Sequence, residues 1–334
     1  MNQTTVGSAR LTAVLSASLL AFAGCGDGGA GAGSLRVLLE PEDVVIEGLE
    51  PGDGGEDIRD GWAVTFDRYL LAVGDIDLHF ATDPSREAEA PEVHVVDLTQ
   101  LSPSGLSLWT LDGLREGRWE VWYATPGAAD GSMPHDDVAE EDHDAMIASD
   151  WTYLVDGVLT KADGESCPPA ALATPGDRTP NGNTSGGNDC YDAPSVRFTF
   201  GATAETTYGP CEADGVQGVA IAAGATQTAA LTIHGDHLFF NGFPEGAEGG
   251  VSRLAQWLAD CDLDLDGTVT REELEAIAPS DLPEIDDRFQ LGGSPITPLA
   301  DMYDYAIAQL KTQGHFQGEG ECPIDGAEHD HGHH

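Results

Sequence analysis

Basic residues are scarce in this chain of 334 amino acids. It carries 14 lysines and arginines against 59 aspartates and glutamates, for a formal net charge of −45. A surface this negative repels phosphate backbones, so we expect no nucleic-acid partner. It attracts divalent cations and keeps a protein in solution, and we interpret most of these carboxylates as solvated surface groups.

Long apolar runs are missing as well. The one apolar stretch near the N-terminus, 11–23, follows a single charge, Arg10, and is too short to remain as a helix across about 30 Å of hydrocarbon. This pattern predicts a signal peptide over 1–24. The signal peptide leads us to expect an exported chain, and no other segment is apolar enough to cross a bilayer.

The end of this segment, Phe22-Ala23-Gly24-Cys25, resembles the bacterial lipobox. The resemblance implies that Cys25 is the lipidated N-terminus of the mature protein and that the membrane is a partner through this lipid anchor. Gly26 after the cysteine leaves outer-membrane delivery open, so the expected location is periplasmic or at the cell surface. The glycine-rich range 25–35 is predicted to be a flexible tether. The alternative is an ordinary secretory signal.

Recognised catalytic motifs are absent. The sequence has no nucleophile elbow, zincin helix, phosphate loop or kinase signature. Carboxylates are so abundant that choosing a catalytic pair among them would be arbitrary. We therefore expect a non-enzymatic protein, with a metal-dependent hydrolase as a minor alternative.

The cysteines fit no zinc pattern, because no C-x-x-C pair occurs. An exported chain folds in an oxidising compartment, which favours disulfides. We predict a Cys167–Cys190 bond that closes a loop rich in Pro, Gly and Asn. We also predict that Cys322 pairs with Cys261 or Cys211, and the odd count leaves one thiol over.

Alternating apolar and polar residues predict an α+β protein. Range 36–245 is expected to form an antiparallel β-sandwich-like domain, with Gly74-Asp75 as one of its turns. Range 248–322 is expected to be a small helical region that contains an EF-hand, and 323–334 a tail rich in His and acids. The clearest strands are 62–66, 119–123, 196–200 and 231–233, and two aperiodic stretches, 125–150 and 163–188, are expected to be surface loops.

Helical spacing dominates the C-terminal region. Val251 to Leu258 place their apolar residues on one helix face. Thr270 followed by Glu273 forms a capping box for a second helix. A third helix is expected to start near Pro298 and to stop at Gly314.

The run DLDLDGTVTREE over 262–273 resembles an EF-hand loop. Calcium requires six to eight oxygen ligands, which this spacing supplies, and Gly267 permits the sharp turn at the centre. The resemblance implies that Ca²⁺ is bound by Asp262, Asp264, Asp266, the Thr268 carbonyl, Thr270 and a bidentate Glu273.

This loop differs from a typical EF-hand in two ways. Leu263 and Leu265 replace polar residues, which predicts that the loop leans against other protein. No second loop follows to receive Val269, the position that normally contacts a partner hand. A calmodulin-like switch is therefore disfavoured, and we interpret calcium as a structural clip on the helical region.

A second candidate metal site involves histidines. His234-Gly-Asp236-His237 follows a predicted strand, and Asp75, Asp77 and His79 share one face of another. Neighbouring strands would create a Cu²⁺ or Zn²⁺ site from His234, Asp236, His237 and His79. The alternative function is thus transition-metal binding or delivery, assisted by His329, His331, His333 and His334 of the tail. Otherwise these polar groups hydrogen-bond one another.

The lipobox, DGWAVTFDRYLLAVGDIDL, TIHGDHLFF and the EF-hand-like loop occur here in one chain. This combination is similar to a set of uncharacterised bacterial lipoproteins. The resemblance implies no activity, and it leaves the protein partner unknown.

Overall fold

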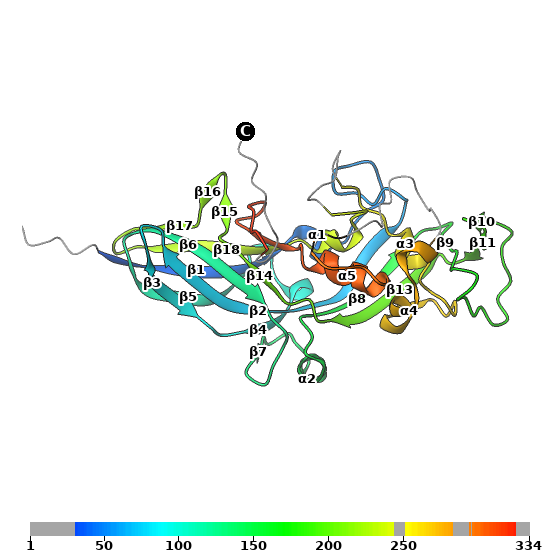
Figure 1. Ribbon diagram of the computed structural model, residues 1–334, viewed down its shortest axis with the longest axis horizontal. Helices are drawn as coiled ribbons and strands as arrows, with labels where there is room; N and C mark the ends of the chain where they lie inside the picture. Colours follow the sequence, from blue (N-terminus) through cyan, green and yellow to red (C-terminus); the bar gives the residue numbers. More distant parts are fainter. Residues whose placement is uncertain (1–30, 244–250, 283–293, 295, 325–334) are drawn as a thin grey trace, which may run out of the picture. The chain divides into compact units, whose positions relative to one another are not determined.

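Two β-sheets carry most of the structured chain (Figure 1). The structure is a computed structural model, and it describes residues 31–243, 251–282, 294 and 296–324. The prediction of a β-rich protein is confirmed. The predicted signal peptide, the lipobox Cys25, the boundary near 245–248 and nearly all of the tail lie outside the described residues.

The smaller sheet has four strands in the order β20-β18-β1-β5. Strand β1 pairs in parallel with β18 and antiparallel with β5. The expected purely antiparallel pairing is therefore wrong here, because β1 and β18 come from distant parts of the sequence and need no hairpin between them. The strands are β1 (Ala32–Pro41), β5 (Leu106–Arg115), β18 (Thr226–Ile233) and β20 (Gly314–Phe316). Strand β1 thus begins inside the range predicted as a tether.

The larger sheet has ten strands arranged around β2, which runs for 18 residues from Ala63 to Phe80. The first half of β2 pairs with β8, its middle with β4, and its last residues with β3 and β6. The other members are β3 (Asp83–Ala90), β4 (His94–Asp97), β6 (Gly117–Thr125), β7 (Met133–Pro134), β8 (Tyr153–Thr160), β13 (Ser195–Ala202), β14 (Thr206–Tyr208), β17 (Val219–Ile221) and β19 (Thr268–Thr270).

Short elements complete the described chain. The helices are α1 (Asp43–Glu47), α2 (Glu140–Ser149), α3 (Gln256–Ala259), α4 (Arg271–Ala276) and α5 (Met302–Leu310), with 3₁₀ turns η1 (Leu98–Gln100), η2 (Gly235–Phe239) and η3 (Pro279–Asp281). Two-residue strands form three small ribbons: β9 (Glu165–Ser166), β10 (Thr184–Ser185), β11 (Asn188–Asp189), β12 (Tyr191–Asp192), β15 (Glu212–Ala213) and β16 (Val216–Gln217). The aperiodic stretch 125–150 thus contains β7 and α2, and 163–188 contains β9 and β10. No helix among the described residues is long and apolar enough to span a membrane.

The core follows the predicted alternation. Along β6, Trp119, Val121 and Tyr123 are buried while their neighbours are partly exposed. Strand β13 alternates in the same way and buries Val196 and Phe198 completely. Burial of such a side chain contributes about 1.5–3 kcal/mol relative to exposure, so these two strands anchor the ten-stranded sheet.

The expected turn at Gly74-Asp75 is wrong. Strand β2 continues through both residues as a bulge, with a register shift against β6 between Gly74 and Asp77. Asp75 has a φ of 50°, and a Cβ on Gly74 would lie 2.5 Å from the carbonyl oxygen of Glu92. The Gly-Asp pair bends one long strand and does not end it.

The helix expected from Val251 begins only at Gln256. Upstream of it, Arg253 forms β-bridges with Ile58 and with Phe240. The carboxylate of Asp60 accepts hydrogen bonds from the backbone N–H groups of Ala255 and Gln256, both at 2.8 Å. These long-range contacts hold the preceding residues extended and outweigh their helical spacing.

Two disulfides connect distant parts of the chain. Cys167–Cys190 matches the prediction. Cys322 pairs with Cys211, one of the two predicted alternatives, and Cys261 is left as a buried free thiol. Both bonds are compatible with folding in an oxidising compartment.

Candidate metal centres

The EF-hand-like loop, 262–273, begins shortly after α3, includes β19 and ends in the first turn of α4. The predicted capping box is present: the Thr270 side chain accepts from the backbone N–H of Glu273, and Glu273 Oε2 accepts from the N–H of Thr270 at 2.8 Å. This reciprocal bonding fixes the glutamate at the start of α4. The last residue of the motif therefore points back toward the first.

Three carboxylates converge in the loop. Asp262, Asp264 and Glu273 each offer an oxygen, and these oxygens lie within 4.8 Å of one another. Asp262 Oδ2 accepts from the N–H of Gly267 at 3.0 Å, and Glu273 Oε1 accepts from the N–H of Leu263 at 2.9 Å. Asp262 Oδ1 is buried and has no hydrogen-bond partner. An orphaned carboxylate oxygen among hard oxygen donors fits a bound Ca²⁺.

The remaining predicted ligands shape the turn. Asp264 Oδ1 accepts from the N–H of Asp266 at 3.0 Å, and Asp266 Oδ1 accepts from the N–H of Thr268 at 2.8 Å. Gly267 takes a φ of 90° at the centre, where a side chain would be strained. Asp266 and Thr268 thus lie along the loop, while Asp262, Asp264 and Glu273 gather at one point.

Among the described residues, no lysine, arginine or histidine forms an ion pair with these loop carboxylates. Burial, followed by repulsion from Glu273, Asp266 and Asp264, raises the pKa of Asp262 to about 7. A divalent cation would lower that pKa again, because it stabilises the carboxylate form. The loop therefore has the electrostatics of a cation site.

The EF-hand-like loop is attached to the ten-stranded sheet by a strand pairing. Strand β19 pairs in parallel with β13, with Val269 opposite Phe198. Val269 and Phe198 are both fully buried. Val269 thus packs into the main sheet through this strand pairing.

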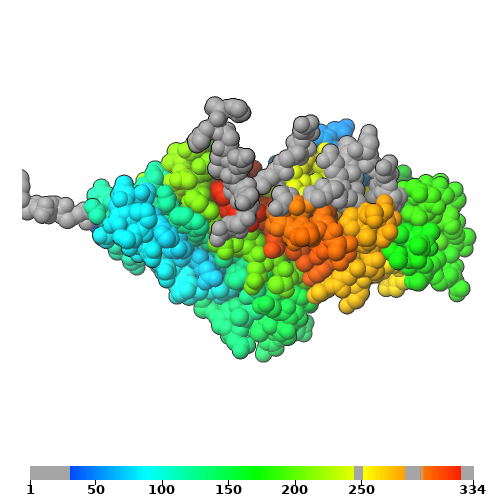
Figure 2. Space-filling view, viewed as in Figure 1, coloured from blue at the N-terminus to red at the C-terminus, as the bar shows by residue number. Residues whose placement is uncertain are grey.

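The insertion 163–188 covers the other side of the loop. The N–H of Thr174 donates to the carbonyl of Leu263 at 2.7 Å, and Arg178 Nη1 donates to the carbonyl of Leu265 at 2.8 Å. Leu263 and Leu265 are 8% and 3% exposed, so the prediction that this loop leans against protein is confirmed. Figure 2 shows the insertion, in green, beside the gold segment that contains the loop.

Arg178 is expected to support the shape of the loop, since its Nη2 also donates to the carbonyl of Asp192. Replacing Arg178 by Ala removes both bonds, and we predict about a tenfold weaker calcium affinity, in line with the loss of an outer-shell support. A calcium titration of this variant tests the expectation, with the exposed Arg86→Ala as control. Equal affinities of Arg178→Ala and wild type would show that the insertion does not support the loop.

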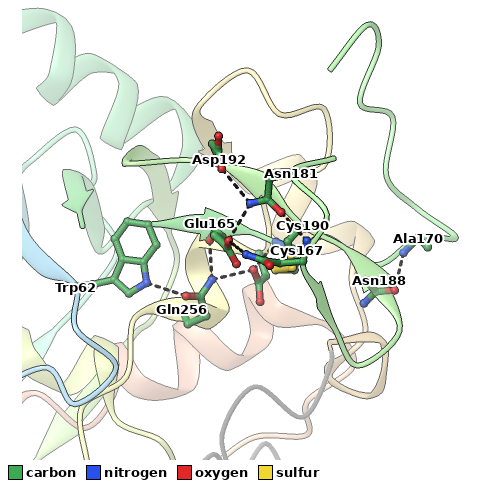
Figure 3. Close-up of a disulfide and its surroundings, with 11 residues drawn as sticks. Trp62, Glu165, Cys167, Ala170, Asn181, Asn188, Cys190, Asp192 and Gln256 are labelled. Atoms are coloured by element: carbon green, nitrogen blue, oxygen red, sulfur yellow. Dashed lines mark hydrogen bonds between the residues drawn. A yellow bond between two sulfur atoms is a disulfide. The ribbon is translucent and has the colours of Figure 1, made fainter. Parts of the chain in front are cut away.

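Helix α3 is fixed by polar contacts next to the Cys167–Cys190 disulfide (Figure 3). Gln256 Oε1 accepts from the indole N–H of Trp62 at 3.0 Å, and its Nε2 donates to the carbonyl of Glu165 at 2.8 Å. The N–H of Cys167 donates to Asp260 Oδ1 at 2.7 Å. The helix that enters the loop is thereby tied to the disulfide-linked insertion.

A second cluster forms where strands of the smaller sheet end. Because β1 and β18 are parallel and end opposite each other at Pro41 and Ile233, Glu42 and His234 emerge side by side. Strand β20 is the next neighbour and contributes His315 opposite Thr232. The His234 ring centroid lies 4.2 Å from that of His315.

His237 and Asp236 join this cluster through η2. The His237 ring lies 5.5 Å from His234 and 5.3 Å from His315. Ligand atoms of His234, Asp236 and His237 lie within 4.8 Å of one another. A Cβ on Gly235 would lie 2.5 Å from Val45 Cγ2, so glycine is needed for η2 to pack against α1.

Burial controls the protonation of these groups. It lowers the pKa of His237 to about 4 and that of His315 to about 3, so both rings are neutral at pH 7. Burial also raises the pKa of Glu42 to about 7, against the lowering effect of His234. Asp236 has no exposed surface and forms an ion pair with Arg253 through Oδ2.

His79 does not join this cluster. It lies on β2 of the larger sheet, where its Nε2 is 2.7 Å from Asp77 Oδ2 and its ring contacts Trp122. The predicted sharing of a face by Asp77 and His79 is thus observed. His79 lies in a strand of the larger sheet, whereas His234 directly follows a strand of the smaller sheet, and the structure does not place the two histidines in one cluster.

Sequence reasoning missed Glu42 and His315. Neither lies in a recognisable motif, and both reach the site only through the β20-β18-β1 strand order. The third group of possible ligands, Glu165 with Cys167 and Cys190, is accounted for by the disulfide.

No family model, curated protein or solved structure matches this chain.

Proposed function

We propose that the protein is an exported, lipid-anchored calcium-binding protein without enzymatic activity. In this protein Ca²⁺ clips the C-terminal segment onto the larger sheet. The lipobox at Cys25 and the two disulfides support export. The EF-hand-like spacing of 262–273 supports calcium as the cofactor.

One observation supports the proposal that calcium acts as a structural clip. Strand β19, inside the loop, pairs with β13 of the ten-stranded sheet. Any ion held by Asp262 and Glu273 would join the two ends of the segment that makes this pairing. Calcium binding and the docking of β19 are therefore coupled. Extracellular calcium levels suit even weak sites of this class, with Kd on the order of 10⁻⁴–10⁻³ M.

Isothermal calorimetry with Ca²⁺ tests this function. The wild-type protein is expected to bind one ion in the loop, and Glu273→Gln is expected to abolish that binding because it removes the bidentate ligand. Glu272→Gln, one residue earlier and exposed, is the matched control and should bind as wild type does. A titration of the wild type without heat at millimolar Ca²⁺ would reject the proposal.

A further inference from the structure

Three buried polar atoms without hydrogen-bond partners belong to the histidine cluster. They are Glu42 Oε2, Asp236 Oδ1 and His315 Nδ1. A buried unpartnered polar atom costs about 1–3 kcal/mol. The two carboxyls can pair with each other only by sharing a proton, whereas a bound cation would satisfy both of them and the imidazole nitrogen. The cluster combines imidazole nitrogens with carboxylate oxygens.

The hydrogen bonds of His237 fix which of its nitrogens is free. The Thr312 hydroxyl donates its single proton to the carbonyl of Gln309 at 2.7 Å. It must therefore accept from His237 Nδ1, at 2.9 Å. The ring then carries its proton on Nδ1 and leaves Nε2 with a free lone pair, which is the arrangement of a metal-ligating histidine with an outer-shell partner.

His234 contacts a backbone carbonyl through one ring nitrogen and a carboxylate through the other. Its Nε2 lies 3.3 Å from the carbonyl oxygen of Gly318, which can only accept, so the proton is on Nε2. Its Nδ1 lies 3.4 Å from Glu42 Oε1. That separation is longer than an ordinary hydrogen bond. It equals the distance of about 3.4 Å between two ligands that each lie about 2.1 Å from a tetrahedral ion.

A route for an ion reaches the cluster. A pocket of about 540 Å³ is lined by His237 and His315, together with Thr312, Phe240 and Tyr208. The cluster is otherwise enclosed, with His234 4% and His237 6% exposed. A nitrogen-rich, enclosed set of this kind selects Zn²⁺ or Cu²⁺ over Ca²⁺, which prefers oxygen ligands.

We propose that His234, Asp236 and His237, whose ligand atoms lie within 4.8 Å of one another, form a transition-metal site for Zn²⁺ or Cu²⁺, with His315 and Glu42 next to them. Thr312 orients His237. Asp236 lies beside the three rings, with Oδ2 bound to Arg253 and Oδ1 free to face the ion. This site is independent of the calcium loop and uses different ligand chemistry.

Zinc titration in the presence of millimolar Ca²⁺ tests the site. The protein should first have His329, His331, His333 and His334 replaced by Ala, because the tail would bind zinc by itself. This background is expected to bind one Zn²⁺ per chain. His237→Ala in the same background should weaken the Kd at least 100-fold, whereas His79→Ala, on the other sheet, should leave it unchanged.

Failure to bind zinc with the cluster intact, or equal affinity of His237→Ala, would overturn the proposal. If His237→Ala does not fold, electron paramagnetic resonance of Cu²⁺ in the unaltered cluster decides. Hyperfine coupling to imidazole nitrogens supports the site, and its absence rejects it. The zinc affinity should also be unchanged by Asp262→Ala, because this site does not depend on the calcium loop.

Discussion

Chelating calcium is expected to lower the midpoint of thermal unfolding by about 3 °C. Ca²⁺ at about ten times its Kd, as 1 mM would be for a Kd of about 10⁻⁴ M, stabilises the folded state by about 1.4 kcal/mol. For a chain of this size, each kcal/mol corresponds to about 2 °C. Loss of the ion is also expected to weaken the edge of the sheet, because the loop holds β19 against β13.

Melting curves in EGTA and in millimolar Ca²⁺ measure this shift. Glu273→Gln should melt at the chelated midpoint in both solutions, because the carboxylate that closes the loop is gone. Glu272→Gln should respond as wild type does. Identical wild-type midpoints in EGTA and Ca²⁺ would mean that calcium does not stabilise the fold.

Loss of the Cys211–Cys322 disulfide is expected to cost about 5 kcal/mol. The two cysteines are 111 residues apart, and in the chain-entropy treatment a longer closed loop gives the larger stabilisation. The Cys167–Cys190 pair spans only 23 residues and should contribute about 3 kcal/mol. The double Ser variant of the first pair should therefore be the less stable one.

Urea unfolding of the two double Ser variants measures this difference. The wild type in reductant is the control and should be destabilised at least as strongly as either variant. A cost below about 1 kcal/mol for Cys211→Ser with Cys322→Ser would show that the long-range bond is not formed. That outcome would also weaken the case for an exported protein.

Local patterns in the sequence predicted the parts of the fold that depend on local physics. Strand alternation identified β6 and β13, because burial on one face imposes a period of two. The capping box of Thr270 and Glu273 is equally predictable from the sequence, because its two residues are only three positions apart. The Cys167–Cys190 bond was favoured because its two cysteines enclose one turn-rich loop.

Features that depend on long-range pairing were missed. The bulge at Gly74 resembles a turn unless the pairing of β2 with β6 is known. The start of α3 is set by Asp60, almost two hundred residues earlier in the chain. His315 joins His234 only because β20 adds to the edge of β18, and a short strand of three residues gives no periodic signal.

Hydrogen–deuterium exchange with and without Ca²⁺ tests the calcium clip most directly. The account predicts that Ca²⁺ slows exchange in peptides covering 262–276 and also in those covering 195–202, because β19 and β13 share backbone hydrogen bonds. Peptides from β5, in the other sheet, should be unaffected. Calcium-independent exchange in both 262–276 and 195–202, or protection confined to the loop, would contradict it.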